Sequence, residues 1–186
     1  RVRERGKLVV VPMRGWRRSM RWPETGLTWI PTSPYIPDFA AVIGYPMTGL
    51  GTYLTEFSHG FPGMRYPFRG IYHPRVKDDV LERDLRALNI PGLSYRRISV
   101  PNREGKPATG VYVEVSDYDD WRPTELSFYL KKLACKYEGK NPFASASPMN
   151  VNGFMKHMGS TAFFNAIKRE GARVDVATFI REWQVQ

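Results

Sequence analysis

The sequence has little cysteine and histidine, and it carries no familiar catalytic signature. Its 186 residues include one cysteine, Cys135, so no disulfide can form within the chain. The three histidines, His59, His73 and His157, are too scattered to indicate a local metal site. The chain has no GxSxG, HExxH, P-loop or dinucleotide-binding motif. These absences argue against a serine hydrolase, a zinc peptidase and a nucleotide-dependent enzyme, and we expect neither a metal nor a cofactor.

Long apolar runs are also absent. No stretch of about 18 apolar residues occurs, so we expect no helix that spans a membrane. The basic residues 1–7 precede only four apolar residues, 8–11, which is too short for the core of a signal peptide. The hydrophobic content of 42% and the charged content of 25% are those of an ordinary globular protein.

What the chain does have is positive charge. Its net charge is +10, which favours polyanionic partners such as nucleic acid, anionic lipid or an acidic wall polymer. The densest basic cluster is Arg14, Arg17, Arg18 and Arg21, interleaved with Trp16 and Trp22. This cluster keeps a nucleic-acid-binding domain open as an alternative. No zinc-ligand spacing, basic-zipper pattern or RNA-recognition signature supports it.

The first 39 residues are expected to form two segments, a strand and a long connection. Residues 8–11 are typical of a short buried strand, which cannot bury itself without neighbours. We therefore expect residues 1–14 to hold the last strand of a sheet whose other strands lie outside this chain. Residues 15–39 contain four prolines and three tryptophans, which predict a long but ordered connection rather than a helix.

Residues 40–186 predict one domain that mixes strands and helices. The apolar run at 40–45 is typical of a buried strand, and periodicity elsewhere separates strands from helices. Further strands are expected at 67–72, 94–100 and 110–117, and helices at 78–89, 124–137 and 150–183, the last broken at Gly159 and Gly171. This order predicts the α/β (α+β) class, with a mixed sheet flanked by helices.

Two carboxylates in unusual loops are candidate site residues. Glu24 lies between Pro23 and Gly26, and Glu56 lies in the glycine-bounded loop 51–60. Glycosidases commonly place two carboxyl groups around the scissile bond, one of them with a raised pKa. The residues alone favour the role of ordinary loop acids that pair with nearby arginines, and for Glu56 such a partner would be an arginine such as Arg65.

Several segments resemble one family. Residues 8–34 resemble the pattern VVxMxxWxRxMxxxxTGLxWxxxSP of the NamZ-type exo-β-N-acetylmuramidases. Residues 51–56 resemble the family's GTNxSEGRGT loop, and Pro67 and Phe68 match the RPF that follows it. Residues 110–123 resemble GVxxxVTDxxxFxP, and residues 154–183 resemble the closing helices. The resemblance covers nearly the whole chain, although Tyr53 replaces an asparagine and residues 57–60 replace Gly-Arg-Gly.

The resemblance implies an architecture and an activity. Members have an N-terminal Rossmann-like domain and a C-terminal α/β domain, with the active site between them. This chain would then be the C-terminal part of a two-domain enzyme that removes terminal N-acetylmuramic acid from peptidoglycan fragments. The principal catalytic carboxylate would lie in the N-terminal domain, so we expect the isolated chain to be inactive. The enzyme would be extracellular or periplasmic, with its export signal upstream.

The same resemblance suggests site residues. Glu56 is the candidate active-site acid, and Glu24, Arg18, Tyr53, Ser58 and His59 are candidates for substrate binding. The paired donors of a guanidinium such as Arg18 match the two oxygens of the lactyl carboxylate of muramic acid. A non-catalytic module that binds peptidoglycan or another sugar remains an alternative to the glycosidase.

Overall fold

A computed structural model describes residues 6–61, 65–102 and 104–184 of the chain. The chain divides into two compact units, Arg1–Ile30 and Pro31–Gln186, and each is described by itself.

The first unit has little regular structure. A short 3-10 helix, η1 (Trp22–Thr25), has Pro23 in its first turn and ends at Gly26, whose φ is 68°. The indole rings of Trp22 and Trp29 lie edge to face, with centroids 5.3 Å apart. Residues 8–11 form no strand with any residue that the structure describes, and they are 69% to 85% exposed. The sheet that we expect here would need strands from outside this chain, so the assignment of residues 8–11 to its last strand stays a prediction.

The second unit contains a three-stranded antiparallel sheet. Strands β2 (Leu93–Pro101) and β3 (Pro107–Val115) form a hairpin, and β1 (Gly70–Ile71) pairs with the other edge of β3. The α+β class and the two long strands are confirmed, but the sheet is antiparallel rather than mixed. The strand expected at 67–72 is reduced to two residues. The carbonyl oxygen of Tyr66 accepts hydrogen bonds from the amides of Arg69 and Gly70, so the chain turns just before the strand begins.

The predicted strand at 40–45 is a helix in the structure. Asp38 caps helix α1 (Phe39–Gly44), since its side chain accepts a hydrogen bond of 2.8 Å from the Ala41 amide. The helix continues directly into a π-helical turn, η2 (Tyr45–Gly49). The prediction of a strand is therefore wrong at this position.

The remaining helices agree with the sequence-based expectation. The three helices near the C-terminus are separated at Gly159 and Gly171, both with positive φ, as predicted. Their bounds and those of the earlier helices are α2 (Asp78–Ala87), α3 (Glu125–Tyr137), α4 (Pro148–Met158), α5 (Thr161–Glu170), the 3-10 turn η3 (Gly171–Arg173) and α6 (Val176–Gln184). Each helix of the described part of the chain falls short of the length and apolarity needed to cross a membrane.

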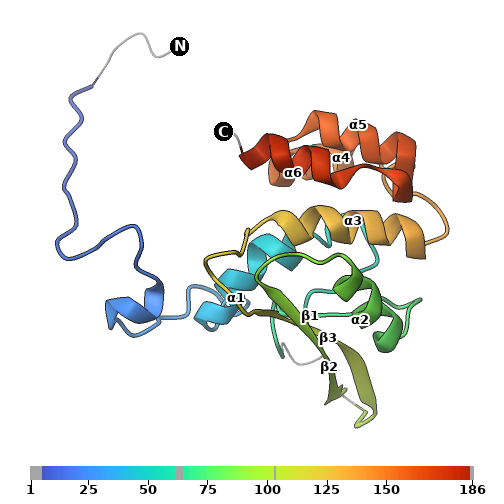
Figure 1. The fold of residues 1–186 in the computed structure, drawn as a ribbon, viewed down its shortest axis with the longest axis horizontal. Coiled ribbons are helices and arrows are strands. Elements are labelled where there is room, and N and C mark those ends of the chain that lie inside the picture. Colours follow the sequence, from blue (N-terminus) through green and yellow to red (C-terminus); the bar gives the residue numbers. More distant parts are fainter. Residues whose placement is uncertain (1–5, 62–64, 103, 185–186) are drawn as a thin grey trace. The chain divides into compact units, whose positions relative to one another are not determined.

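Helix α3 lies between two apolar cores. In Figure 1, α4, α5 and α6 gather on one side of α3, and the sheet with α2 lies on the other. Leu126, Leu130 and Leu133 pack into the core formed with the sheet, α1 and α2. Phe128 packs into the second core, together with α4, α5 and α6. A helix that is buried on both faces is held rigidly, so side chains at its two ends are well positioned.

Candidate active site

The loop at 51–60, which carries Glu56, follows the π-helical turn directly. Its first turns are closed by hydrogen bonds from the Thr52 amide to the Thr48 carbonyl, and from the Thr55 amide and hydroxyl to the Thr52 carbonyl. Gly51 allows close packing, since a Cβ atom there would lie 2.6 Å from the Met47 carbonyl oxygen. The loop is thus fixed at its start by backbone contacts that the sequence alone does not reveal.

Glu56 forms a two-pronged ion pair with Arg75. The Arg75 Nε and Nη2 atoms lie 2.7 Å and 2.5 Å from the two carboxylate oxygens, and both side chains are partly exposed. The hydrogen bond with Arg75 lowers the pKa of Glu56 below its ordinary value. The partner is therefore Arg75 rather than the Arg65 suggested by the sequence, and the carboxylate is ionised at neutral pH.

A second carboxylate, Glu138, holds the backbone of the same loop. Its Oε1 atom accepts a hydrogen bond of 2.7 Å from the Glu56 amide, and it lies 3.5 Å from Nε2 of the buried His73. That second distance is too long for a good hydrogen bond, so the contact with His73 is mainly electrostatic. Glu138 ends helix α3, which links the loop to the rigid centre of the domain.

His73 completes this cluster in its neutral form. Its Nδ1 atom accepts a hydrogen bond from the Arg75 amide, so the ring proton is assigned to Nε2, which faces Glu138. Burial lowers the pKa of His73, and the nearby Glu138 partly opposes that shift. The rings of Phe57 and Tyr137 pack edge-on against the imidazole, with centroids 4.8 Å and 5.4 Å away.

The sequence analysis missed Arg75, His73 and Glu138 as neighbours of Glu56. Arg75 follows Glu56 by 19 positions and Glu138 follows it by 82, so no local motif connects them. The one feature of the sequence that could have indicated these residues is the run His73-Pro74-Arg75, which places two basic side chains close together.

Ser58 and His59 line a cavity of about 180 Å³. Ser58 pairs with Tyr72 through backbone hydrogen bonds, and the imidazole of His59 stacks on the ring of Phe68 with centroids 4.8 Å apart. The other lining residues are Tyr35, Gly60, Phe61, Pro67 and Phe68. Two of the six candidate residues thus share one cavity.

Tyr53 lies elsewhere on the unit. Its ring stacks on that of His157 in α4, with centroids 4.8 Å apart, and its hydroxyl group packs against Gly153. A Cβ atom at position 153 would lie 1.8 Å from this hydroxyl group, so glycine leaves room for the tyrosine. In this structure Tyr53 packs against the second apolar core and is not among the residues that line the cavity with Ser58.

Arg18 and Glu24 belong to the first unit. Arg18 is exposed to solvent. The carboxylate of Glu24 accepts a hydrogen bond of 3.0 Å from the Arg21 amide, which places it at the start of η1. This local bond fixes the orientation of the Glu24 side chain relative to its own turn.

The side chains of the second unit that could take part in a reaction are carboxylates and basic groups. Within the described ranges, no group of three or more histidine, cysteine, aspartate or glutamate side chains is arranged to hold a metal ion. Burial raises the pKa of Cys135 to about 12, so its thiol is protonated at neutral pH and is a poor nucleophile. The cluster around Glu56 therefore remains the strongest candidate for a site that binds or converts a substrate.

Fold and site together define an α+β domain whose candidate site is a charge-paired carboxylate on a loop beside a small cavity. Comparison with known families gives this class a name. Residues 43–186 match the model of the C-terminal part of the exo-β-N-acetylmuramidase NamZ, and residues 2–40 match the model of its N-terminal part. The chain belongs to the NamZ family.

Individual relatives agree with this assignment. The peptidoglycan β-N-acetylmuramidase NamZ of Bacillus subtilis is 34% identical over 131 residues, which are 67% of this chain and 31% of that protein. A crystal structure of a DUF1343 family protein from Bacteroides fragilis has the same fold, with a TM-score of 0.74 and 24% identity. That match covers 91% of this chain and 46% of the other. The chain thus spans about a third of its curated relative and about half of the solved structure.

Proposed function

We propose that this chain is part of an exo-acting glycosidase that removes terminal N-acetylmuramic acid from peptidoglycan fragments. The observation that carries the proposal is the family match over residues 43–186, supported by the 34% identity with a relative named as a peptidoglycan β-N-acetylmuramidase. The chain would supply one wall of the active-site cleft, and the N-terminal domain of the same protein would supply the other. Such an enzyme would act outside the cytoplasm, in an extracellular or periplasmic location.

In this proposal Glu56 acts in its ionised form. A general acid must keep its proton until the transition state, and glycosidases raise the pKa of that group. The ion pair with Arg75 shifts the pKa of Glu56 in the opposite direction. Glu56 therefore suits the role of a base, or of a carboxylate that orients a substrate hydroxyl group, and the general acid belongs to the N-terminal domain.

The other candidates would bind the substrate. Ser58 and His59, which belong to the same loop as Glu56, line a cavity that would receive a sugar ring. Arg18 would contact the lactyl carboxylate of muramic acid, because a guanidinium matches the two oxygens of a carboxylate. Glu24 and Tyr53, which are not among the residues that line this cavity, would contact parts of the substrate that extend beyond it.

The proposal is tested with the full-length protein and two chromogenic substrates. We expect release of para-nitrophenol from its glycoside of N-acetylmuramic acid, and little release from the matched glycoside of N-acetylglucosamine, which lacks the lactyl carboxylate. Residues 1–186 alone are expected to release neither. Saturable binding of the muramic acid glycoside without turnover by the full-length protein would instead support a sugar-binding module. Tight duplex binding that weakens steeply with salt would support the nucleic-acid alternative.

A further inference from the structure

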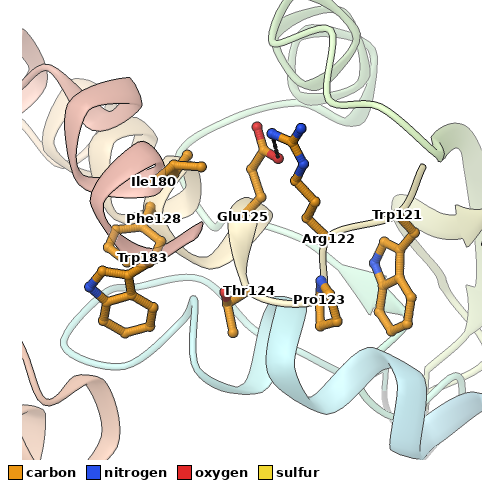
Figure 2. Close-up of a pocket in the computed structure, with 8 residues that line it drawn as sticks. All are labelled: Trp121, Arg122, Pro123, Thr124, Glu125, Phe128, Ile180 and Trp183. Carbon is orange, nitrogen blue, oxygen red and sulfur yellow. Dashed lines mark ion pairs between the residues drawn. The ribbon is translucent and has the colours of Figure 1, made fainter. Parts of the chain in front are cut away.

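A second cavity, of about 250 Å³, lies between the start of α3 and the end of α6. Figure 2 shows Ile180, Phe128 and Trp183 along one side, Arg122 and Trp121 along the other, and the residues that begin α3 between them. The remaining lining residues are Pro123, Thr124 and Glu125. This cavity shares no lining residue with the one that contains Ser58 and His59.

The most unusual group in this cavity is the carboxylate of Glu125. The residue is only 8% exposed, and its Oε2 atom accepts no hydrogen bond from any residue in the described ranges. The nearest cation, Nη1 of Arg122, lies 3.8 Å away, which is beyond hydrogen-bonding distance. Buried polar atoms without a partner are rare, and a bound water molecule or ion is one of the explanations for them.

Two further polar groups lie beside this carboxylate. Thr124 occupies the N-cap position of α3, but its side chain does not make the hydrogen bond that caps a helix. The guanidinium of Arg122 is half exposed at the edge of the cavity. The cavity therefore offers an acceptor, a hydroxyl group and a set of donors within one short segment.

The rest of the lining is apolar and includes three aromatic rings. Trp183 is 38% exposed and packs edge to face on Phe128, with centroids 4.9 Å apart. The ring of Trp121 packs edge to face on the ring of Tyr118, with centroids 5.9 Å apart. Its indole nitrogen also donates a hydrogen bond to the sulfur of Met47. Rings held in this way present rigid apolar surface at low cost in conformational entropy.

We propose that this cavity binds one pyranose ring of a neutral glycan, with an apolar face of the sugar against the indole rings and a hydroxyl group donating to Glu125. A second hydroxyl group would accept from Arg122. Its volume is below the range of about 300–1,000 Å³ that is typical of sites for drug-sized ligands, so a single ring fits rather than a longer segment. The choice of an N-acetylglucosamine-containing chain as the glycan rests on the proposed function.

The test is calorimetric titration of the full-length protein with the trisaccharide of β-1,4-linked N-acetylglucosamine, which contains no muramic acid for the proposed activity to remove. We expect saturable binding that is weakened at least about tenfold by Glu125→Leu, which removes the acceptor. Arg122→Met should also weaken binding, and it decides the question if the first variant does not fold. The matched control is Glu104→Gln, since Glu104 is exposed and paired with Lys106.

Absence of saturable binding, or unchanged affinity in the variants that fold, would overturn the proposal. Hydrolysis of the chromogenic muramic acid glycoside, measured on the same samples, separates this inference from the proposed function. Trisaccharide binding without hydrolysis supports the cavity and contradicts the glycosidase. Hydrolysis without trisaccharide binding contradicts the cavity alone.

Discussion

Replacing Lys131 with methionine is expected to flatten the dependence of the protein's stability on pH. Lys131 lies in the middle of α3 and is fully buried. Its Nζ atom donates hydrogen bonds to the carbonyl oxygens of Leu50 and Ser127, and it forms no ion pair with any residue of the described part. Burial without a counter-charge lowers the pKa of this lysine to about 7 in the folded protein.

The sign and size of the effect follow from linkage between folding and protonation. The unfolded lysine has a pKa of 10.5, so between about pH 7 and pH 10.5 the unfolded chain binds a proton that the folded chain does not. Stability must therefore rise with pH in this window. For these two pKa values the gain from about pH 7 to about pH 9 is on the order of 2 kcal/mol. Methionine has no proton to exchange, so the variant should lack this gain.

The measurement is urea unfolding of the wild type and of Lys131→Met at several pH values between about 7 and 9, with the linear extrapolation of the free energy of unfolding. The variant also loses the hydrogen bonds to the Leu50 and Ser127 carbonyl oxygens, but that loss is the same at each pH and cancels from the slope. Lys140→Met, at an exposed position, is the control and should keep the wild-type slope. Equal slopes for wild type and Lys131→Met would show that water or a counter-charge reaches the ammonium group and would refute the reasoning.

Three further predictions concern the site and its support. Glu56→Gln in the full-length protein should lower kcat of the proposed hydrolysis by about 10²–10⁴-fold with little change in KM, as expected for a group that assists proton transfer. An unchanged kcat would assign Glu56 a structural role. Gly44→Ala should lower the free energy of unfolding by about 1–3 kcal/mol, because the new Cβ atom would meet the Phe68 carbonyl oxygen. In thermal unfolding the control Gly60→Ala should be neutral, because its new Cβ atom would lie no closer than 3.9 Å to another atom. Because the pKa of His73 is lowered in the folded protein, the unfolded chain takes up a proton before the folded chain does as the pH falls through 6.5, and stability falls. The variant His73→Phe should therefore lose less stability between neutral and mildly acidic pH, measured by urea unfolding.

The strand that the sequence predicts at 40–45 shows that the spacing of apolar residues does not separate a strand from a helix in a short apolar run. Six consecutive apolar or small residues fit a buried strand and a short buried helix equally well. The deciding contact is the cap that Asp38 provides for the Ala41 amide, together with the continuation into a π-helical turn. By contrast, α2 and α3 are 10 and 13 residues long and carry leucines at helical spacing, so their positions follow from the sequence.

The candidate site was less accessible to sequence reasoning than the fold. The loop around Glu56 was identifiable by its glycines and its resemblance to a family pattern, and so were Ser58 and His59 beside it. The partners that determine the charge state of Glu56 come from distant segments, which only the folded chain brings together. The sequence-based expectation of an arginine partner was correct in kind, but it named Arg65 where the structure has Arg75.

One helix explains why these distant segments meet. The first residue of α3, Glu125, lines the cavity beside the tryptophans, and its centre, Lys131, binds the Leu50 carbonyl just before the Glu56 loop. The C-cap of the same helix, Glu138, holds the Glu56 amide. Because α3 is packed between two cores, a change at any of these three positions acts on a rigid element rather than on a loop. The helix therefore couples the stability of the domain to the geometry of both cavities, and variants along it should be judged on folding and on ligand binding together.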